Sequence, residues 1–187
     1  MPFGLVEWVV LAVIAERPAH GFAIAALTAH EGELGRIWHV PRPLVYRALG
    51  RLEGEQLIVA EGSESGRGPR RTPYRCTPAG RRRLEAWLPT PVQHIRDVRS
   101  EFLLKLALHQ RRGSDPGALI AGQREVVAPI AAALATERAR SDGFDAVLLA
   151  WRESSAAAVL GFLDQIGPAL PRPHVATRVV RAPADGR

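Results

Sequence analysis

The chain has 187 residues, of which 47% are hydrophobic and 24% are charged. This composition is that of a folded globular protein, and the length fits one small domain with an appended module better than two full domains. The formal net charge of +6 favours an acidic partner such as a nucleic acid. A single cysteine, Cys76, excludes an intramolecular disulfide.

Targeting and cofactor signals are missing from the sequence. The longest apolar stretch, Trp8 to Ala15, is about half as long as a membrane-spanning helix, so we expect no transmembrane helix and no membrane partner. The segment Met1 to Leu5 lacks the basic start and cleavage site of a secretory signal, which predicts a cytoplasmic protein. No Cys/His spacing resembles a zinc site, and we expect neither a metal nor a cofactor. For Cys76 we favour a packed strand residue over a redox-sensing thiol.

Three helices are predicted in the first part of the chain. Leu5 to Glu16 is almost continuously apolar and ends at Arg17-Pro18, because proline disfavours helix at the preceding residue. A second helical pattern runs from His20 to about His30. The third helix should start at Pro43, where the missing amide proton costs nothing, and continue to about Glu55.

A β-hairpin and a fourth helix are predicted next. Leu57 to Ala60 and Thr72 to Cys76 read as strands on either side of a glycine-rich loop. Thr77 and Pro78 form a capped helix start, and that helix should end at Pro89. The order helix, helix, helix, strand, loop, strand, helix is typical of a winged helix-turn-helix domain.

Three further helical segments follow the short hinge at residues 89–91. They span about Ile95 to Gln110, Asp115 to Arg140 and Phe144 to Ile166, with capping residues expected at Ser114-Asp115 and Ser141-Asp142. The predicted fold class is therefore mainly α with a small β-hairpin. We expect a winged-helix DNA-binding domain over residues 1–89, a helical dimerisation and effector module over 90–167, and a mobile tail over 168–187.

The third helix has two distinct faces. At about 100° per residue, its apolar residues fall on one arc that should pack on the first two helices: Leu44, Val45, Ala48, Leu49 and Leu52. The opposite arc carries Tyr46, Arg47 and Arg51, with Arg42 and Pro43 at the start. Arginine forks on such a face can reach guanine edges or phosphates. A solvated helix face is the alternative for this helix taken alone.

The predicted loop between the strands adds a second basic element. Seven arginines and no acid occur from Arg67 to Arg83, and Arg67, Arg70 and Arg71 lie on the loop itself. A basic loop can follow a phosphate backbone or enter the minor groove. Two independent basic elements in one small domain predict binding to double-stranded DNA.

Three strings in this order resemble the PadR family of transcriptional regulators. They are His20-Gly21-Phe22-Ala23-Ile24, the segment Leu44 to Glu53, and Tyr74 to Gly80 together with Trp87-Leu88. The resemblance implies a winged-helix repressor that dimerises through C-terminal helices and responds to small aromatic or drug-like ligands. By position, Tyr46 matches the recognition-helix tyrosine of the family and Arg67 to Arg71 match its wing tip. Two departures are Arg42-Pro43 at the helix start and Gln56, where the family usually has glycine.

The last helical segment is more apolar than one solvent-facing helix requires. We expect it to pair with a second copy of the chain, and the predicted dimer contacts are Phe144, Leu148, Trp151, Leu160, Phe162 and Leu163. A dimer would favour a palindromic operator, with its two reading helices about 34 Å apart. A small aromatic or hydrophobic effector is expected, but the sequence assigns no residue to it.

Other classes of function fit the sequence less well. No nucleophile elbow, phosphate-binding glycine loop or metal signature is present, so we do not expect an enzyme. A winged helix used only for protein contacts is the alternative function. It would have a neutral outward face on the third helix, and the arginines argue against it.

Overall fold

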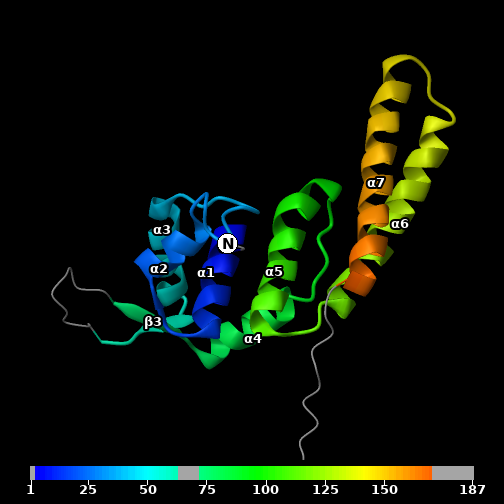
Figure 1. Ribbon diagram of the computed structural model, residues 1–187. Coiled ribbons are helices and arrows are strands. Elements are labelled where there is room, and N and C mark those ends of the chain that lie inside the picture. The colour runs from blue at the N-terminus through cyan, green and yellow to red at the C-terminus, as the bar shows by residue number, and fades with distance from the viewer. Residues whose placement is uncertain (1–2, 63–71, 170–187) are drawn as a thin grey trace, which may run out of the picture.

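The computed structural model of the protein describes residues 3–62 and 72–169. Its first helix, α1 (Leu5–Glu16), has the predicted bounds. The residues from Val9 to Ala15 are all buried, because α1 lies at the centre of the N-terminal part (Figure 1) and contacts α3, α4, α5 and β3. This position explains why α1 is apolar on every side.

The next two helices form the helix-turn-helix unit. In α2 (Gly21–Thr28), the His20 side chain caps the start by accepting a hydrogen bond from the Ala23 amide at 3.0 Å. The turn that follows is compact, since a Cβ atom on Gly35 would overlap the Ala29 carbonyl oxygen. The third helix, α3 (Arg42–Gly54), has a proline in its first turn, as predicted.

A small antiparallel sheet has three strands, one more than predicted. The expected hairpin is present as β2 (Ile58–Ala60) and β3 (Pro73–Cys76), with Ile58 opposite Cys76. On the other edge of β3 lies β1 (Ala19–His20), which gives the order β1-β3-β2. A strand of two residues is too short to produce an alternating pattern, so sequence periodicity could not predict it.

The hairpin leads into α4 (Pro78–Trp87), which Thr77 caps as predicted. The Thr77 hydroxyl accepts a hydrogen bond from the Gly80 amide at 3.1 Å and lies 2.9 Å from the Gln56 carbonyl oxygen. A Cβ atom on Gly80 would overlap the Leu57 carbonyl oxygen and lie 2.9 Å from the Cys76 sulfur. Helix α4 therefore packs very closely on the start of β2.

The segment predicted as one helix from Ile95 begins with two irregular turns. A 3₁₀ turn, η1 (Ile95–Asp97), and a π-helical turn, η2 (Val98–Phe102), precede α5 (Leu103–Arg112). Helix α5 ends at Gly113, whose φ of 61° is left-handed. It lies beside α1 (Figure 1), and Leu104 and Leu108 belong to the same buried core as α1.

The last two helices are long and form an antiparallel hairpin that projects from the rest of the molecule (Figure 1). They are α6 (Gly117–Arg138) and α7 (Gly143–Ala169). The N-cap of α6 is Pro116, without a side-chain cap, and not the predicted Ser114-Asp115. Asp115 lies one residue earlier, and its carboxylate accepts a hydrogen bond from the Gly117 amide at 2.8 Å. A second, smaller core lies at the base of the hairpin and consists of Val92, Val98, Phe102, Leu119 and Leu163.

Candidate nucleic-acid interface and groove

The two faces of α3 are separated as the sequence predicts. Val45, Ala48, Leu49 and Leu52 are buried, and Leu44 is half-buried against the same core. Arg42, Pro43, Tyr46 and Arg47 are exposed on the other side. The first half of α3 thus presents a basic and partly aromatic surface to solvent.

Arg51 is the exception among the residues expected on that surface. Its guanidinium lies 3.2 Å from the Glu7 carboxylate, 3.9 Å from that of Glu55, and 4.8 Å from the centre of the Phe3 ring. Two carboxylates and an aromatic ring therefore hold this side chain against the start of α1. Helical spacing alone places Arg51 beside Arg47, but these contacts direct it toward the body of the domain, which weighs against a DNA contact.

Phe22, which the sequence analysis did not single out as a site residue, lies next to the exposed face of α3. It occupies the first turn of α2, and the Arg42 guanidinium lies 5.4 Å from its ring centre and 5.6 Å from that of Tyr46. The Arg42 side chain also approaches the Tyr46 hydroxyl at 3.5 Å. An aromatic residue in the string His20-Gly21-Phe22 was the available signal, but only the fold brings it to α3.

The predicted wing residues Arg67, Arg70 and Arg71 lie outside the described residues, so their role stays a prediction. Other arginines of the same acid-free run are paired within the fold. The Arg75 guanidinium lies 2.5 Å from the Glu61 carboxylate, and that of Arg83 lies 2.8 Å from Glu55. The run therefore contributes less unpaired positive charge than its sequence suggests.

A buried lysine joins α4 to α5. Lys105 is 1% exposed, and its ammonium group contacts the Glu101 carboxylate at 2.8 Å and the Thr90 carbonyl oxygen at 2.7 Å. It also lies 4.4 Å from the centre of the Trp87 ring, which stacks on Trp8. Burial lowers the pKa of Lys105, and the ion pair with Glu101 opposes that shift. The π-helical turn η2 contributes Glu101, so this network ties the irregular turn to the N-terminal core.

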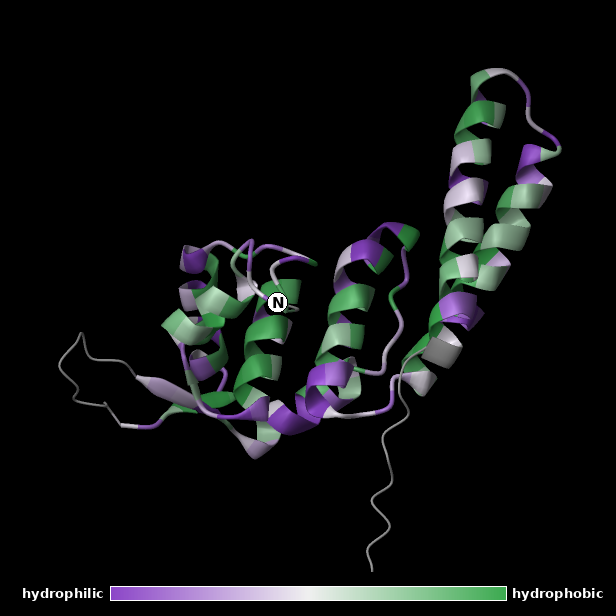
Figure 2. Cartoon of the chain, viewed as in Figure 1, coloured by the Kyte–Doolittle hydropathy of each residue, from purple (hydrophilic) through white to green (hydrophobic). Residues whose placement is uncertain are grey.

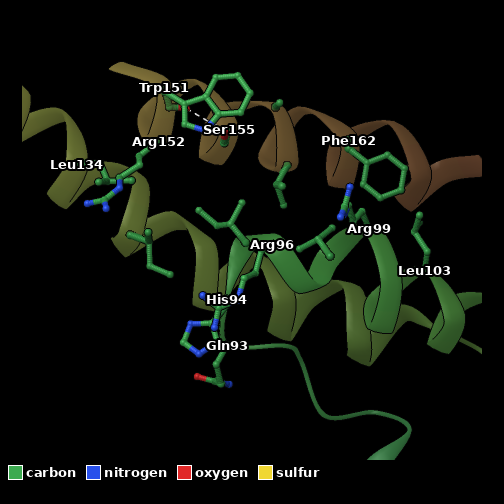
Figure 3. Close-up of a pocket in the computed structure, with 15 residues that line it drawn as sticks. Gln93, His94, Arg96, Arg99, Leu103, Leu134, Trp151, Arg152, Ser155 and Phe162 are labelled. Atoms are coloured by element: carbon green, nitrogen blue, oxygen red, sulfur yellow. Dashed lines mark hydrogen bonds between the residues drawn. The ribbon is translucent and has the colours of Figure 1, made fainter. Parts of the chain in front are cut away.

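A groove of about 820 Å³ lies between the irregular turns and the helical hairpin. In Figure 3, Trp151 and Phe162 come from α7, Leu134 from α6, and Arg96 and Arg99 from the η1–η2 segment. Most of its lining is apolar, and three arginines are present: Arg96, Arg99 and Arg152. No carboxylate is among the lining residues. This volume and lining suit a small molecule with an apolar body.

Arg96 and Arg99 also line a second, smaller hollow. That hollow is bounded by Ile37, Trp38 and His39, which belong to the segment before α3. The two arginines are therefore shared by the groove and by a hollow next to the segment that leads into α3. A ligand that moved them would disturb both hollows.

The predicted dimer residues fall into two groups. Phe144 is 78% exposed and Trp151 is 72% exposed, and Leu148 is also exposed. Leu163 is 1% exposed and belongs to the second core of its own chain, and Phe162 packs on that core. Leu160 is half-buried. The apolar surface exposed to solvent is therefore on the first half of α7, which we call its outer half. Val147, also exposed, belongs to the same surface.

Both helices of the hairpin are hydrophobic over a greater length than the sequence led us to expect of any helix in the chain. By length and composition, α6 and α7 could each cross a membrane, although little of either helix is buried within the chain. We expected no membrane-spanning helix from the sequence because only uninterrupted apolar stretches were considered. Helices α6 and α7 contain scattered polar residues, so neither of them has a long uninterrupted stretch. Each helix has an adjacent charged pair, Arg124-Glu125 and Arg152-Glu153, which would be costly in hydrocarbon. Figure 2 shows how hydrophobic residues follow both helices.

The environment of the Cys76 thiol bears on its reactivity. Cys76 is buried, and burial raises the pKa of its thiol, which disfavours the reactive thiolate. Within residues 3–62 and 72–169, no group of three His, Cys, Asp or Glu side chains is placed to hold a metal ion.

Comparison with known protein families finds a match for the N-terminal part of the chain. Residues 10–86 match the model of the transcriptional regulator PadR-like family. This part of the chain is therefore similar to PadR-like regulators. The matched residues include the second half of α1, all of α2 and α3, the sheet and nearly all of α4, so the family match and the winged-helix fold agree. A comparison with curated proteins finds no match.

Solved structures of PadR regulators are similar over most of the chain, at low identity. Bacillus subtilis PadR in complex with operator DNA is 18% identical, with 89% of this chain and 99% of that chain covered and a TM-score of 0.47. The same protein in complex with p-coumaric acid is 17% identical, with coverages of 88% and 94% and a TM-score of 0.40. A PadR-like regulator from Bacillus cereus is 21% identical, with coverages of 88% and 96% and a TM-score of 0.39. The PadR-like assignment rests on the family match, not on these scores.

Proposed function

We propose that this chain is a DNA-binding transcriptional regulator that contacts a duplex through the first half of α3 and through the wing. The observation that carries the proposal is the separation of α3 into a buried face and an exposed face with Arg42, Tyr46 and Arg47. Residues in the first turns of a recognition helix are those that reach base edges in the major groove. The PadR-like match over residues 10–86 supports the same function.

Substitution of Arg47 tests the contact made by α3. Arg47→Ala should weaken binding to a specific duplex by about 1 to 3 kcal/mol if Arg47 contacts a base. Arg140→Ala is the matched control, because it removes the same charge from an exposed site near the end of α6. Fluorescence anisotropy with the promoter upstream of the chain's own gene provides the measurement. Equal affinity of Arg47→Ala and Arg140→Ala would show that the assigned face is wrong.

The wing is tested separately, by salt dependence. Arg70→Ala should weaken binding to every duplex and make the dependence of log K on log salt less steep by about one unit. If the winged helix served only protein contacts, neither the wild type nor the variants would show salt-dependent affinity for DNA.

We propose further that the regulator is a homodimer, in which each chain buries the outer half of α7 against the other chain. Phe144, Val147, Leu148 and Trp151 leave an apolar surface exposed at the end of the hairpin, and soluble proteins rarely leave large apolar patches uncovered. Two recognition helices related by a two-fold axis favour a palindromic operator. A soluble dimer of this kind also accounts for the hydropathy of α6 and α7 and agrees with a cytoplasmic location.

Oligomeric state tests the dimer directly. Trp151→Glu should dissociate it, because a carboxylate would be buried in an apolar contact, whereas Trp151→Phe should leave it intact. Sedimentation at several protein concentrations distinguishes the two states. A wild-type chain that stays monomeric at micromolar concentration would contradict the proposal.

The groove is our candidate for the effector site of a ligand-responsive repressor. Its apolar lining suits an aromatic or aliphatic body, and Arg96, Arg99 and Arg152 favour an acidic group on the ligand. Binding there would act on α3 through the η1–η2 segment and Ile37 to His39. Naphthoate should bind in the groove and cause the protein to release DNA. The neutral amide of the same compound should bind in the groove more weakly. Ile130→Trp should fill the groove and abolish the response, while DNA affinity without ligand stays unchanged.

A further inference from the structure

Phe22, Arg42 and Tyr46 form a small exposed cluster at the junction of α2 and α3, and we call it the aromatic clamp. Phe22 is 50% exposed and Tyr46 is 45% exposed, although both are large aromatic side chains. The Arg42 guanidinium lies within 5.6 Å of both ring centres. About half of each ring is therefore exposed to solvent on the face of the molecule that carries Arg42.

Close packing of α2 on α3 fixes the position of the clamp. A Cβ atom on Gly21 would lie 2.9 Å from a Tyr46 ring carbon and 2.9 Å from the Leu49 side chain. Only a residue without a side chain lets the Tyr46 ring rest on the start of α2. This contact places Phe22 beside the first turn of the recognition helix.

The rings also restrict the Arg42 side chain. An arginine loses much of its rotamer freedom when its side chain is fixed. Contacts with two rings and the Tyr46 hydroxyl restrict Arg42 before any DNA is bound, so less of that entropy is lost on binding. A pre-oriented guanidinium fork matches the O6 and N7 atoms of guanine, which lie side by side in the major groove.

We propose that the aromatic clamp reads a guanine together with a neighbouring thymine. Arg42 donates two hydrogen bonds to the guanine, and the exposed Phe22 ring contacts the thymine methyl group. That methyl is the main apolar group on base edges in the major groove, and Phe22 is the exposed apolar side chain next to Arg42. The inference rests on the proposed DNA-binding function and adds a specificity-determining residue, Phe22, on α2.

The contacts of Arg51 support this location. Glu7, Glu55 and Phe3 hold Arg51 at the other end of α3, whereas the clamp is at the end where recognition helices reach base edges. The clamp therefore has the geometry to act in base recognition, and Arg51 has the geometry of a structural contact.

Base analogues test the proposal on the full chain. A duplex is first selected by the full-length protein from a random-sequence library, and each thymine and guanine in it is then replaced singly. Uracil lacks the thymine methyl, and 7-deazaguanine lacks the N7 acceptor. We expect one thymine whose replacement weakens binding by about fourfold, the worth of one buried methyl group. Next to it we expect one guanine whose replacement weakens binding by about tenfold or more.

Variants assign these positions to the clamp. In Phe22→Ala, replacement of that thymine by uracil should not weaken binding any further. Replacement of any other thymine should change the affinity by the same factor as in the wild type. In Arg42→Met, which has no donor, the same should hold for the 7-deazaguanine position. Thermal unfolding of both variants should match the wild type, as should the affinity of Phe22→Ala for non-specific duplex, which excludes misfolding as the cause.

The outcomes separate the two proposals. If no selected duplex binds in preference to random DNA, the proposed function itself fails. If a duplex is selected but Phe22→Ala keeps the full uracil effect at every thymine, DNA binding stands and the aromatic clamp is overturned. If the Arg42 and Phe22 positions are not adjacent in the duplex, the proposal that the clamp reads one base step is overturned.

Discussion

At the scale of single residues, Gln56 has the most unusual backbone. Its φ is 58°, a left-handed conformation that costs a residue with a side chain about 1 to 2 kcal/mol. The carbonyl oxygen of Gln56 is fixed there by the Thr77 hydroxyl at 2.9 Å. The sequence already marked this position as a departure from the glycine usual in the family, and the structure shows what the departure entails.

Gln56→Gly should therefore stabilise the protein. Glycine adopts this conformation without strain but loses more entropy on folding, so a net gain of about 0.5 to 1 kcal/mol is expected. Urea unfolding of the full chain measures it. Gln56→Ala keeps the Cβ atom and should give no gain, and a gain from alanine equal to that from glycine would rule out backbone strain as the cause.

His109 predicts a dependence of stability on pH. It is buried on α5, with Nδ1 2.9 Å from the Ser114 hydroxyl. Burial lowers the pKa of His109 from its ordinary value of 6.5; the Leu88 carbonyl and Asp115 raise it, while Arg112 lowers it. The unfolded chain thus takes up a proton at a higher pH than the folded chain does.

The consequence is a loss of stability on acidification. The contribution of neutral His109 is complete above pH 6.5 and declines as the pH falls toward the lower folded pKa. His109→Gln cannot be protonated, so its free energy of unfolding should fall less steeply between about pH 7.5 and pH 5. Other titrating groups are common to both proteins and cancel in the comparison. Parallel curves for the two proteins would contradict the prediction.

At the scale of elements, Thr77 links two parts of the winged helix. Its hydroxyl caps α4 and also donates toward the Gln56 and Leu57 carbonyl oxygens. Thr77→Ala should destabilise the protein by about 1 to 2 kcal/mol, because it removes a helix cap and takes the hydroxyl donor from the Gln56 carbonyl, whereas the Leu57 carbonyl keeps the amide of residue 77. Thr77→Ser keeps the hydroxyl and should cost much less. Equal losses in the two variants would assign the effect to the methyl group instead.

Sequence periodicity predicted the elements that have a strong local signal. Helix α1 and both faces of α3 follow from continuous or periodic apolar residues, and α4 follows from Thr77-Pro78. Strand β1 and the π-helical turn η2 were missed, because a strand of two residues and a π-helical turn depend on neighbours that are distant in the chain. The contact of Phe22 with Arg42 and the ion pairs of Arg51 also depend on packing between helices, and helical spacing does not reveal them.

At the scale of the whole molecule, the packing of α5 bears on where the winged-helix domain ends. The sequence placed the boundary at residue 89, after the last expected helix of the domain. In the structure, Leu104 and Leu108 are fully buried in the core around α1, and Arg111 pairs with Glu16 at 2.6 Å and with Glu33. We therefore propose that α5 belongs to the N-terminal domain and that the boundary lies at Gly113.

Two fragments test this boundary. Loss of the burial of Leu104 and Leu108 would remove about 3 to 6 kcal/mol, a large part of the 5 to 15 kcal/mol by which a typical domain is stable. A fragment of residues 1–113 should unfold cooperatively in urea, whereas a fragment of residues 1–89 should be unfolded or lack fixed tertiary packing in near-ultraviolet circular dichroism. Leu104→Ala in the longer fragment should lower its midpoint, which links the difference to the core and not to length. If residues 1–89 unfold with the same midpoint as residues 1–113, then α5 contributes nothing to this domain and the boundary at residue 89 holds.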